Sequence, residues 1–172
     1  MRGPLVLVGL MGSGKTSVGA ALARHLGWPH RDLDLELERR WRSTVAEQFE
    51  RVGEKEFRRR ESALLAKLLK EKACVLSTGG GVVLLPANQA LLRRHWTVYL
   101  QASPEVLAGR LTGVQARKRP LLMGQSPLSA LRRLRRQRSE AYKKVATFVV
   151  RASDGDPAQV AQRIGNRYAQ LG

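Results

Sequence analysis

Residues 9–16 constrain this chain more than any other stretch. They read Gly-Leu-Met-Gly-Ser-Gly-Lys-Thr, which matches G-x-x-x-x-G-K-[ST] at every fixed position. The apolar run Leu5–Val8 precedes them and a helical pattern, 18–26, follows. In that context the loop amides wrap a polyphosphate, the lysine reaches the β- and γ-phosphates, and the hydroxyl can ligate Mg²⁺. A chance glycine-rich turn does not explain both flanks, so we predict a nucleoside triphosphate site formed by Gly12, Ser13, Gly14, Lys15 and Thr16.

The length of the chain, 172 residues, suggests one domain. A nucleotide module and a separate substrate domain do not both fit, so a second substrate must bind on insertions within the same fold. No apolar run approaches the roughly 20 residues of a membrane span, and the N-terminus leads straight into the first strand without a signal peptide. Cys74 is the only cysteine, which excludes an intrachain disulfide. We therefore expect a cytoplasmic protein with no membrane partner.

The net charge is +17, from 31 Lys and Arg against 14 Asp and Glu. Between Val106 and Arg151 the only acidic residue is Glu140. One interpretation is a nucleic-acid surface; another is a site for two anionic substrates beside a solvated basic face. Aromatic residues make up 5% of the chain and none is interleaved with the basic run to stack bases. The second interpretation is favoured, and we expect no nucleic-acid partner.

Apolar strands alternate with helical patterns along the chain, which predicts a parallel sheet covered on both faces. Ligands then gather beyond the carboxyl ends of the strands. Three helices are predicted by a capping residue followed by proline, at Ser103, Ser126 and Asp156. Other helices are expected at 15–26, 35–49, 54–72 and 88–94, with a break at Val52-Gly53. Strands are expected at 5–8, 29–34, 73–77, 97–100 and 147–150.

Asp32-Leu33-Asp34 ends the second predicted strand. Carboxylates two residues apart on a strand point to the same side, where they can face Mg²⁺ and a substrate hydroxyl. The alternative is a polar turn in which an aspartate caps the next helix. The place of the pair, after the phosphate-loop helix, favours the functional interpretation. Ser77 stands where many phosphate-loop proteins have a metal-side aspartate, so the metal would rely on Asp32.

Three further segments are candidates for ligand contact. Gly79-Gly80-Gly81 directly follows a predicted strand, where glycines allow backbone amides to approach a ligand closely. The alternative is a flexible turn. The run 53–61 contains three consecutive arginines and, taken alone, is typical of a solvated helix with ion pairs. The basic segment 117–122 is typical of a lid that closes over a transferring phosphate. The alternative is a disordered basic loop.

Taken in order, these motifs resemble those of the shikimate kinases along nearly the whole chain. The phosphate loop alone is shared by very many proteins, whereas the ordered set is specific. The matching segments are 9–16, Asp-Leu-Asp at 32–34, Gly-Glu-x-x-Phe-Arg at 53–58, Ser-Thr-Gly-Gly-Gly at 77–81, Arg-Pro-Leu-Leu at 119–122 and Arg-x-x-x-Tyr at 138–142.

The resemblance implies an α/β phosphate-loop kinase similar to the nucleoside monophosphate kinases, with a five-stranded parallel sheet flanked by helices. It implies a single domain over 1–172, with a substrate-binding insertion at about 33–60 and a lid at about 112–124. The reaction implied is ATP-dependent phosphorylation of the 3-hydroxyl of shikimate. The alternatives are another small-molecule kinase, similar to gluconate kinases, and a phosphate-loop ATPase that binds nucleic acid. We expect a monomer.

The resemblance also assigns roles. Asp34, Lys15 and Arg119 are the expected catalytic residues, and Mg²⁺ is expected at Thr16 and Asp32. Beyond the phosphate loop, the ATP-binding residues are Arg110, Arg119 and Pro157. The substrate-binding residues are Asp34, Arg58, Gly79, Gly80, Gly81 and Arg138.

The chain departs from the family pattern at three positions. Arg42 stands where many members have glycine, Gln48 replaces an aliphatic residue, and Lys118 adds a charge beside the lid arginine. These departures affect the expected local packing and lid movement more than the expected activity.

Overall fold

Five parallel strands form the centre of the computed structural model, which describes residues 3–111, 126–152 and 155–171. The strand order is β2-β3-β1-β4-β5. The five-stranded parallel sheet that the sequence pattern and the resemblance predicted is confirmed. The strands are β1 (Leu5–Val8), β2 (His30–Asp32), β3 (Val75–Ser77), β4 (Trp96–Gln101) and β5 (Phe148–Arg151).

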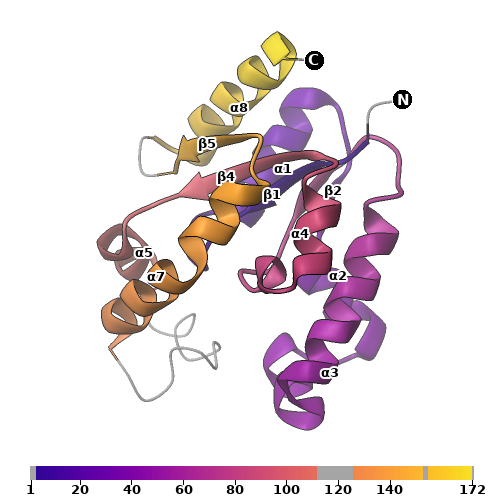
Figure 1. The fold of residues 1–172 in the computed structure, drawn as a ribbon. Helices are drawn as coiled ribbons and strands as arrows, with labels where there is room; N and C mark the ends of the chain where they lie inside the picture. The colour runs from indigo at the N-terminus through magenta and orange to yellow at the C-terminus, as the bar shows by residue number, and fades with distance from the viewer. Residues whose placement is uncertain (1–2, 112–125, 153–154, 172) are drawn as a thin grey trace.

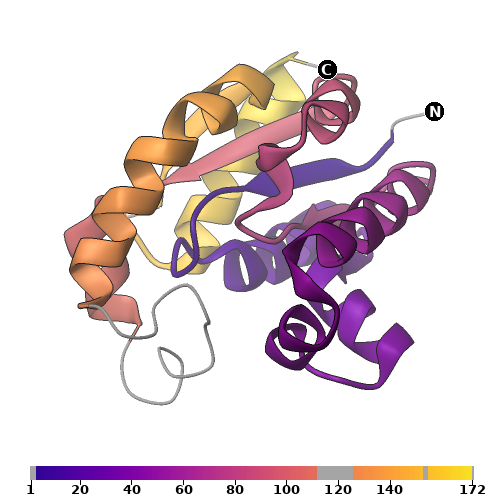
Figure 2. The ribbon, with the colours of Figure 1, turned by 60° about the horizontal axis from the view of Figure 1, so that its bottom comes forward.

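Helices cover both faces of this sheet (Figures 1 and 2). The helices α1 and α8 pack together on one face, and α4 and α7 pack on the other. The helices α2 and α3 contact each other and follow the edge strand β2. The elements are α1 (Lys15–Leu26), α2 (Leu33–Trp41), α3 (Val45–Leu68), the short 3₁₀ helix η1 (Val82–Leu84), α4 (Pro86–Leu92), α5 (Pro104–Arg110), α7 (Pro127–Val145) and α8 (Pro157–Leu171).

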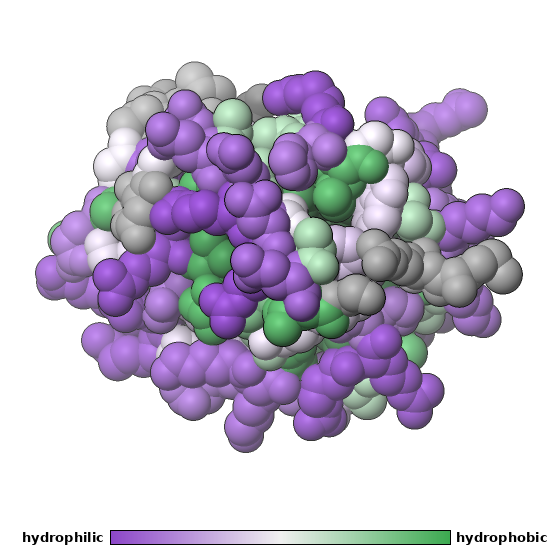
Figure 3. Space-filling view, turned by 90° about the horizontal axis from the view of Figure 1, so that it is seen from above, coloured by the Kyte–Doolittle hydropathy of each residue, from purple (hydrophilic) through white to green (hydrophobic). Residues whose placement is uncertain are grey.

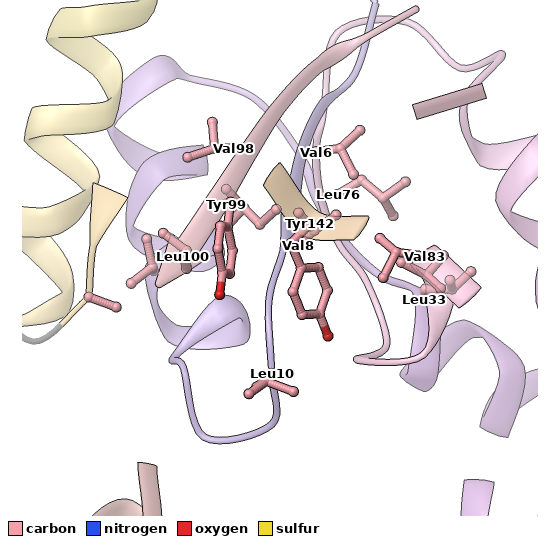
Figure 4. Close-up of a cluster of buried hydrophobic side chains, with 14 of the residues drawn as sticks. Val6, Val8, Leu10, Leu33, Leu76, Val83, Val98, Tyr99, Leu100 and Tyr142 are labelled. Atoms are coloured by element: carbon pink, nitrogen blue, oxygen red, sulfur yellow. The ribbon is translucent and has the colours of Figure 1, made fainter. Parts of the chain in front are cut away.

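The core is built on β1, whose four side chains are fully buried. This strand pairs with β3 on one side and β4 on the other, so that Leu5 lies opposite both Val75 and Trp96. A strand buried on both faces must be apolar throughout, which explains the run Leu5–Val8. Figure 4 shows Val6 and Val8 of this strand in one cluster with side chains of β4 and with Tyr142 of α7.

In the view from above, hydrophilic side chains cover most of the visible face, and hydrophobic ones are visible between them (Figure 3). None of the helices in the described ranges is long and apolar enough to cross a membrane.

Two of the three predicted caps form. The Ser103 side chain accepts a hydrogen bond from Val106 N (3.3 Å), and Asp156 Oδ1 accepts one from Gln159 N (2.9 Å). Ser126 lies at the start of α7 without such a bond, although Pro127 takes the first helical position as predicted. Proline also begins α4 at Pro86, two residues before the predicted start.

The prediction of one helix over 35–49 was wrong, because a turn divides that stretch into α2 and α3. Thr44 caps α3: its side chain accepts a hydrogen bond from Glu47 N (3.2 Å), while the Glu47 carboxylate accepts one from Thr44 N (2.7 Å). This reciprocal capping box stabilises a helix start at Val45. The break predicted at Gly53 is confirmed, because its φ of 76° interrupts the helical geometry of α3.

Two departures from the family pattern meet in this α2–α3 turn. Gln48 is fully buried, and its Nε2 donates to Ser43 O (2.8 Å). An amide in place of an aliphatic side chain therefore satisfies a carbonyl of the turn between α2 and α3. Arg42 ends α2 with a φ of 49°, the only positive φ of a non-glycine residue in the described ranges.

A side chain in this left-handed conformation costs about 1 kcal/mol or more, whereas glycine adopts it freely. We predict that Arg42→Gly raises the free energy of unfolding by about 0.5–1 kcal/mol, measured by urea denaturation. The control is Arg40→Gly, at an exposed helical position of α2. It should lower the same quantity by about 1 kcal/mol. Equal destabilisation by both substitutions would contradict the assignment of strain to Arg42.

Candidate active site

The phosphate loop connects β1 to α1 at the carboxyl end of the sheet. The Lys15 ammonium group lies across this loop and donates to Gly9 O (2.9 Å) and Leu10 O (2.8 Å). A Cβ on Gly9 would lie 2.6 Å from Leu100 O, so β4 excludes a side chain there. Positive φ angles occur at Gly9 (150°), Gly12 (78°) and Gly14 (87°).

Beside this loop, Thr16 and Asp32 form a pair of oxygen ligands. Thr16 Oγ1 donates to Asp32 Oδ2 (2.7 Å), while Asp32 Oδ1 accepts from Asp34 N (3.0 Å) and Leu35 N (3.3 Å). The carboxylate therefore caps α2 and faces the loop at the same time. A single carboxylate beside a hydroxyl and the substrate phosphates suits Mg²⁺, which keeps several waters. The described residues contain no cluster of three or more His, Cys, Asp or Glu that suits a different metal centre.

The prediction that Asp32 and Asp34 lie on one strand was wrong. The strand β2 ends at Asp32, and Asp34 lies in the first turn of α2. The alternative, in which an aspartate caps the next helix, is the correct one for the local structure, because Asp32 is the N-cap of α2. The two carboxylates consequently face different partners: Asp32 faces Thr16, whereas Asp34 lies against Gly79.

Ser77 at the end of β3 does not join this pair. Its hydroxyl donates to Lys15 O (2.8 Å) and lies 3.0 Å from His30 Nε2. It therefore connects β3 to the first turn of α1. Burial lowers the pKa of His30, and the charge of Asp32 opposes that shift in part.

The glycine segment 79–81 follows β3, and charged side chains approach it closely. A Cβ on Gly79 would lie 2.9 Å from both Asp34 Oδ1 and Glu61 Oε1. A Cβ on Gly81 would overlap the Arg58 guanidinium. The absence of side chains at 79–81 is what allows two carboxylates and an arginine to meet here.

Arg58 is held by a buried ion pair on α3. Its Nη1 lies 2.8 Å from Glu61 Oε2, and Glu61 is only 1% exposed. Burial raises the pKa of Glu61, and the positive charge of Arg58 lowers it in part. The guanidinium also lies over the rings of Phe57 (5.3 Å) and Phe49 (5.9 Å). The arginine is therefore fixed against the glycine segment.

Sequence reasoning did not identify Glu61. Its spacing from Arg58, three residues along a helix, places the two side chains on the same face and was the available signal. Its burial depends on the packing of α3 against the sheet, which the sequence pattern does not specify.

A second arginine reaches the glycine segment from α7. Arg138 Nη1 donates to Gly80 O (3.1 Å), and the Tyr142 hydroxyl donates to the same carbonyl. Arg138 Nε is buried without a hydrogen-bond partner among the described residues, while Arg58 Nε lies 3.6 Å from Glu54 Oε1 in a second ion pair. Planar guanidinium groups suit carboxylates, so two arginines at one glycine segment suit an anionic ligand. Sequence reasoning named Arg138 but assigned no contact to Tyr142.

On the far side of the phosphate loop, Arg110 connects two loops. Its Nη2 donates to Ala152 O (2.7 Å), and its Nη1 lies 3.4 Å from Gly12 O. Pro157 is the exposed first residue of α8, which follows the Ala152 loop. Arg110 therefore connects the phosphate loop to the end of the strand that precedes α8. Arg119 and Lys118 lie outside the described residues.

The strand order and a phosphate loop between the central strand and its helix define the class of phosphate-loop kinases with a nucleoside-monophosphate-kinase-like fold. Within that class, the chain belongs to the shikimate kinase family: the family model described as "Shikimate kinase" matches residues 11–169. The fold class and the family resemblance expected from the sequence are confirmed.

Relatives and solved structures agree with this placement. A shikimate kinase from Thiobacillus denitrificans is 47% identical over 150 residues, which cover 87% of this chain and 81% of the relative. A shikimate kinase from Acinetobacter baumannii, solved in complex with shikimate, superposes with a TM-score of 0.94 at 36% identity, over 99% of this chain and 95% of that one. A gluconokinase from Sinorhizobium meliloti, 21% identical with a TM-score of 0.62 over 99% of this chain and 95% of that one, shares the fold.

Proposed function

We propose that this protein transfers the γ-phosphoryl group of ATP to the 3-hydroxyl of shikimate. The observation that carries the proposal is the convergence of Arg58, Arg138 and Asp34 on the glycine segment beside the phosphate loop. Planar guanidinium groups suit a carboxylate, which they bind through two parallel hydrogen bonds. An aspartate beside the same glycine segment suits a hydroxyl. Shikimate has both groups, and family membership supports the same acceptor.

Each residue has a role that follows from its place. Asp34 accepts the proton of the attacking hydroxyl, as a general base must lie within hydrogen-bond reach of that proton. Lys15 leaves the loop carbonyls to neutralise charge on the β- and γ-phosphates. Mg²⁺, when held by Thr16 and Asp32, supplies further charge neutralisation at the phosphates. Arg110 and Pro157 flank the adenine.

Other parts of the proposal rest on the family resemblance. We assign the substrate-binding insertion to residues 33–60 and the lid to 112–124, within a single domain over 1–172. Arg119 of the lid then reaches the transferring phosphate. The use of ATP supports a cytoplasmic location, and we expect a monomer.

Substrate-dependent ADP release distinguishes this function from its alternatives. We expect shikimate to stimulate ADP release by the purified protein, and gluconate and polynucleotide to leave it at the basal rate. Lys15→Met should reduce the shikimate-dependent rate by about 10²–10³-fold, because a preorganised contact to the developing charge is lost. Stimulation by gluconate or polynucleotide instead of shikimate would contradict the proposal.

The two aspartates should respond differently to Mg²⁺. Asp34→Asn should lower kcat by about 10²–10⁴-fold at every Mg²⁺ concentration, because asparagine cannot accept the proton. Asp32→Asn should raise the Mg²⁺ concentration needed for half-maximal rate and retain most of kcat at saturation. The measurement is a Mg²⁺ titration of both variants. If Mg²⁺ restored the Asp34 variant and not the Asp32 variant, the two roles would be reversed.

A further inference from the structure

Tyr142 has an interaction that the proposed reaction does not yet use. Its hydroxyl donates to Gly80 O, the carbonyl that Arg138 Nη1 also contacts at 3.1 Å. Tyr142 and Arg138 are four residues apart on α7 and therefore share one helix face. Two donors from one helix thus converge on a single main-chain acceptor of the glycine segment.

This contact fixes the orientation of a peptide group. In a trans peptide the carbonyl and the following amide N–H point in opposite directions. With Gly80 O turned toward α7, the N–H of Gly81 points away from α7. Residues 79–81 have no side chains that hold them in place, so hydrogen bonds to their carbonyls limit the movement of this segment. Gly79 O accepts from Val82 N (3.3 Å) and Gly81 O from Leu84 N (3.0 Å), whereas Gly80 O accepts from the two α7 side chains.

The tyrosine itself is held rigidly. Its side chain is fully buried and stacks on Tyr99 of β4, with ring centroids 5.0 Å apart and an interplanar angle of 24°. Figure 4 shows the two rings side by side between β4 and α7. Burial also raises the pKa of the Tyr142 hydroxyl, so it remains protonated and able to donate at neutral pH.

The Tyr142 hydroxyl lies near the place where the glycine segment approaches the phosphate loop. A Cβ built on Gly80 would be 3.7 Å from the Tyr142 hydroxyl, 3.5 Å from Gly9 O and 3.6 Å from Met11 N. The peptide that Tyr142 holds therefore lies beside the phosphate loop. A shift of this peptide would move the acceptor side relative to the phosphates, and small misplacements of reacting groups are costly to the rate.

We propose that Tyr142 is a positioning residue that fixes the Gly80–Gly81 peptide, so that Arg138 is free to turn toward the substrate carboxylate. Without Tyr142, Arg138 would be the only side chain that donates to Gly80 O in the described part of the protein. It would then have to serve both the peptide and the substrate. This division of roles rests on the proposed function, since it assumes a carboxylate-bearing acceptor.

The test compares Tyr142→Phe with Tyr99→Phe. Both remove one hydroxyl and keep the stacked rings, but only the first removes the bond to Gly80 O. We expect Tyr142→Phe to lower kcat/KM for shikimate by about 3- to 10-fold, the usual effect of one neutral hydrogen bond. KM for ATP should stay within about twofold of the wild-type value, and Tyr99→Phe should match the wild type in both quantities.

A second measurement tests the peptide directly, without substrates. In ¹⁵N-labelled protein, the Gly81 amide resonance should shift in Tyr142→Phe and stay in place in Tyr99→Phe. Absence of shikimate phosphorylation by the wild type would refute the proposed function, while the amide measurement would still report on the peptide. A Gly81 amide that does not shift, a kcat/KM for shikimate equal to that of the wild type, or equal losses in the two variants would each overturn the role of Tyr142.

Discussion

The acceptor half of the site depends on a stretch of main chain without side chains, Gly79–Gly81. Carboxylates from α2 and α3 approach one end of it, and the Arg58 guanidinium occupies the space that a Cβ on Gly81 would need. At its centre, Gly80 O accepts donors from α7. Side chains from three helices, α2, α3 and α7, thus meet on the same three residues, and the absence of side chains there leaves room for these charged groups.

The sheet order connects this segment to the nucleotide side. Because β3 lies between β2 and β1, the ends of these three strands bring Asp32, the glycine segment and the phosphate loop together. Several of the groups in this arrangement are buried, and burial requires accurate geometry of them. An ion pair as buried as Arg58–Glu61 is tolerated only with good geometry, and the stacked Tyr99 and Tyr142 rings leave the α7 hydroxyl little freedom.

Local signals were sufficient for much of this arrangement. The phosphate loop, the proline-marked helix starts and the break at Gly53 depend on short-range chemistry, so the sequence predicted them. Asp34 was placed on a strand because capping by Asp32 competes with strand continuation, and the sequence pattern favoured neither. The burial of Glu61 and the contact of Tyr142 with Gly80 arise from packing between elements distant in sequence, which periodicity does not specify.

Calorimetric titration of Gly81→Ala with shikimate tests most directly whether the acceptor site depends on this side-chain-free segment. The φ of −96° at Gly81 suits alanine, so the added methyl displaces Arg58 and leaves the backbone unstrained. Gly109→Ala is the control, because a Cβ there meets nothing within 4 Å. We predict at least about tenfold weaker shikimate binding for Gly81→Ala, as expected when a charge-assisted contact is lost. Affinity for an ATP analogue should not change, and Gly109→Ala should bind as the wild type does. Wild-type shikimate affinity in Gly81→Ala would contradict the account.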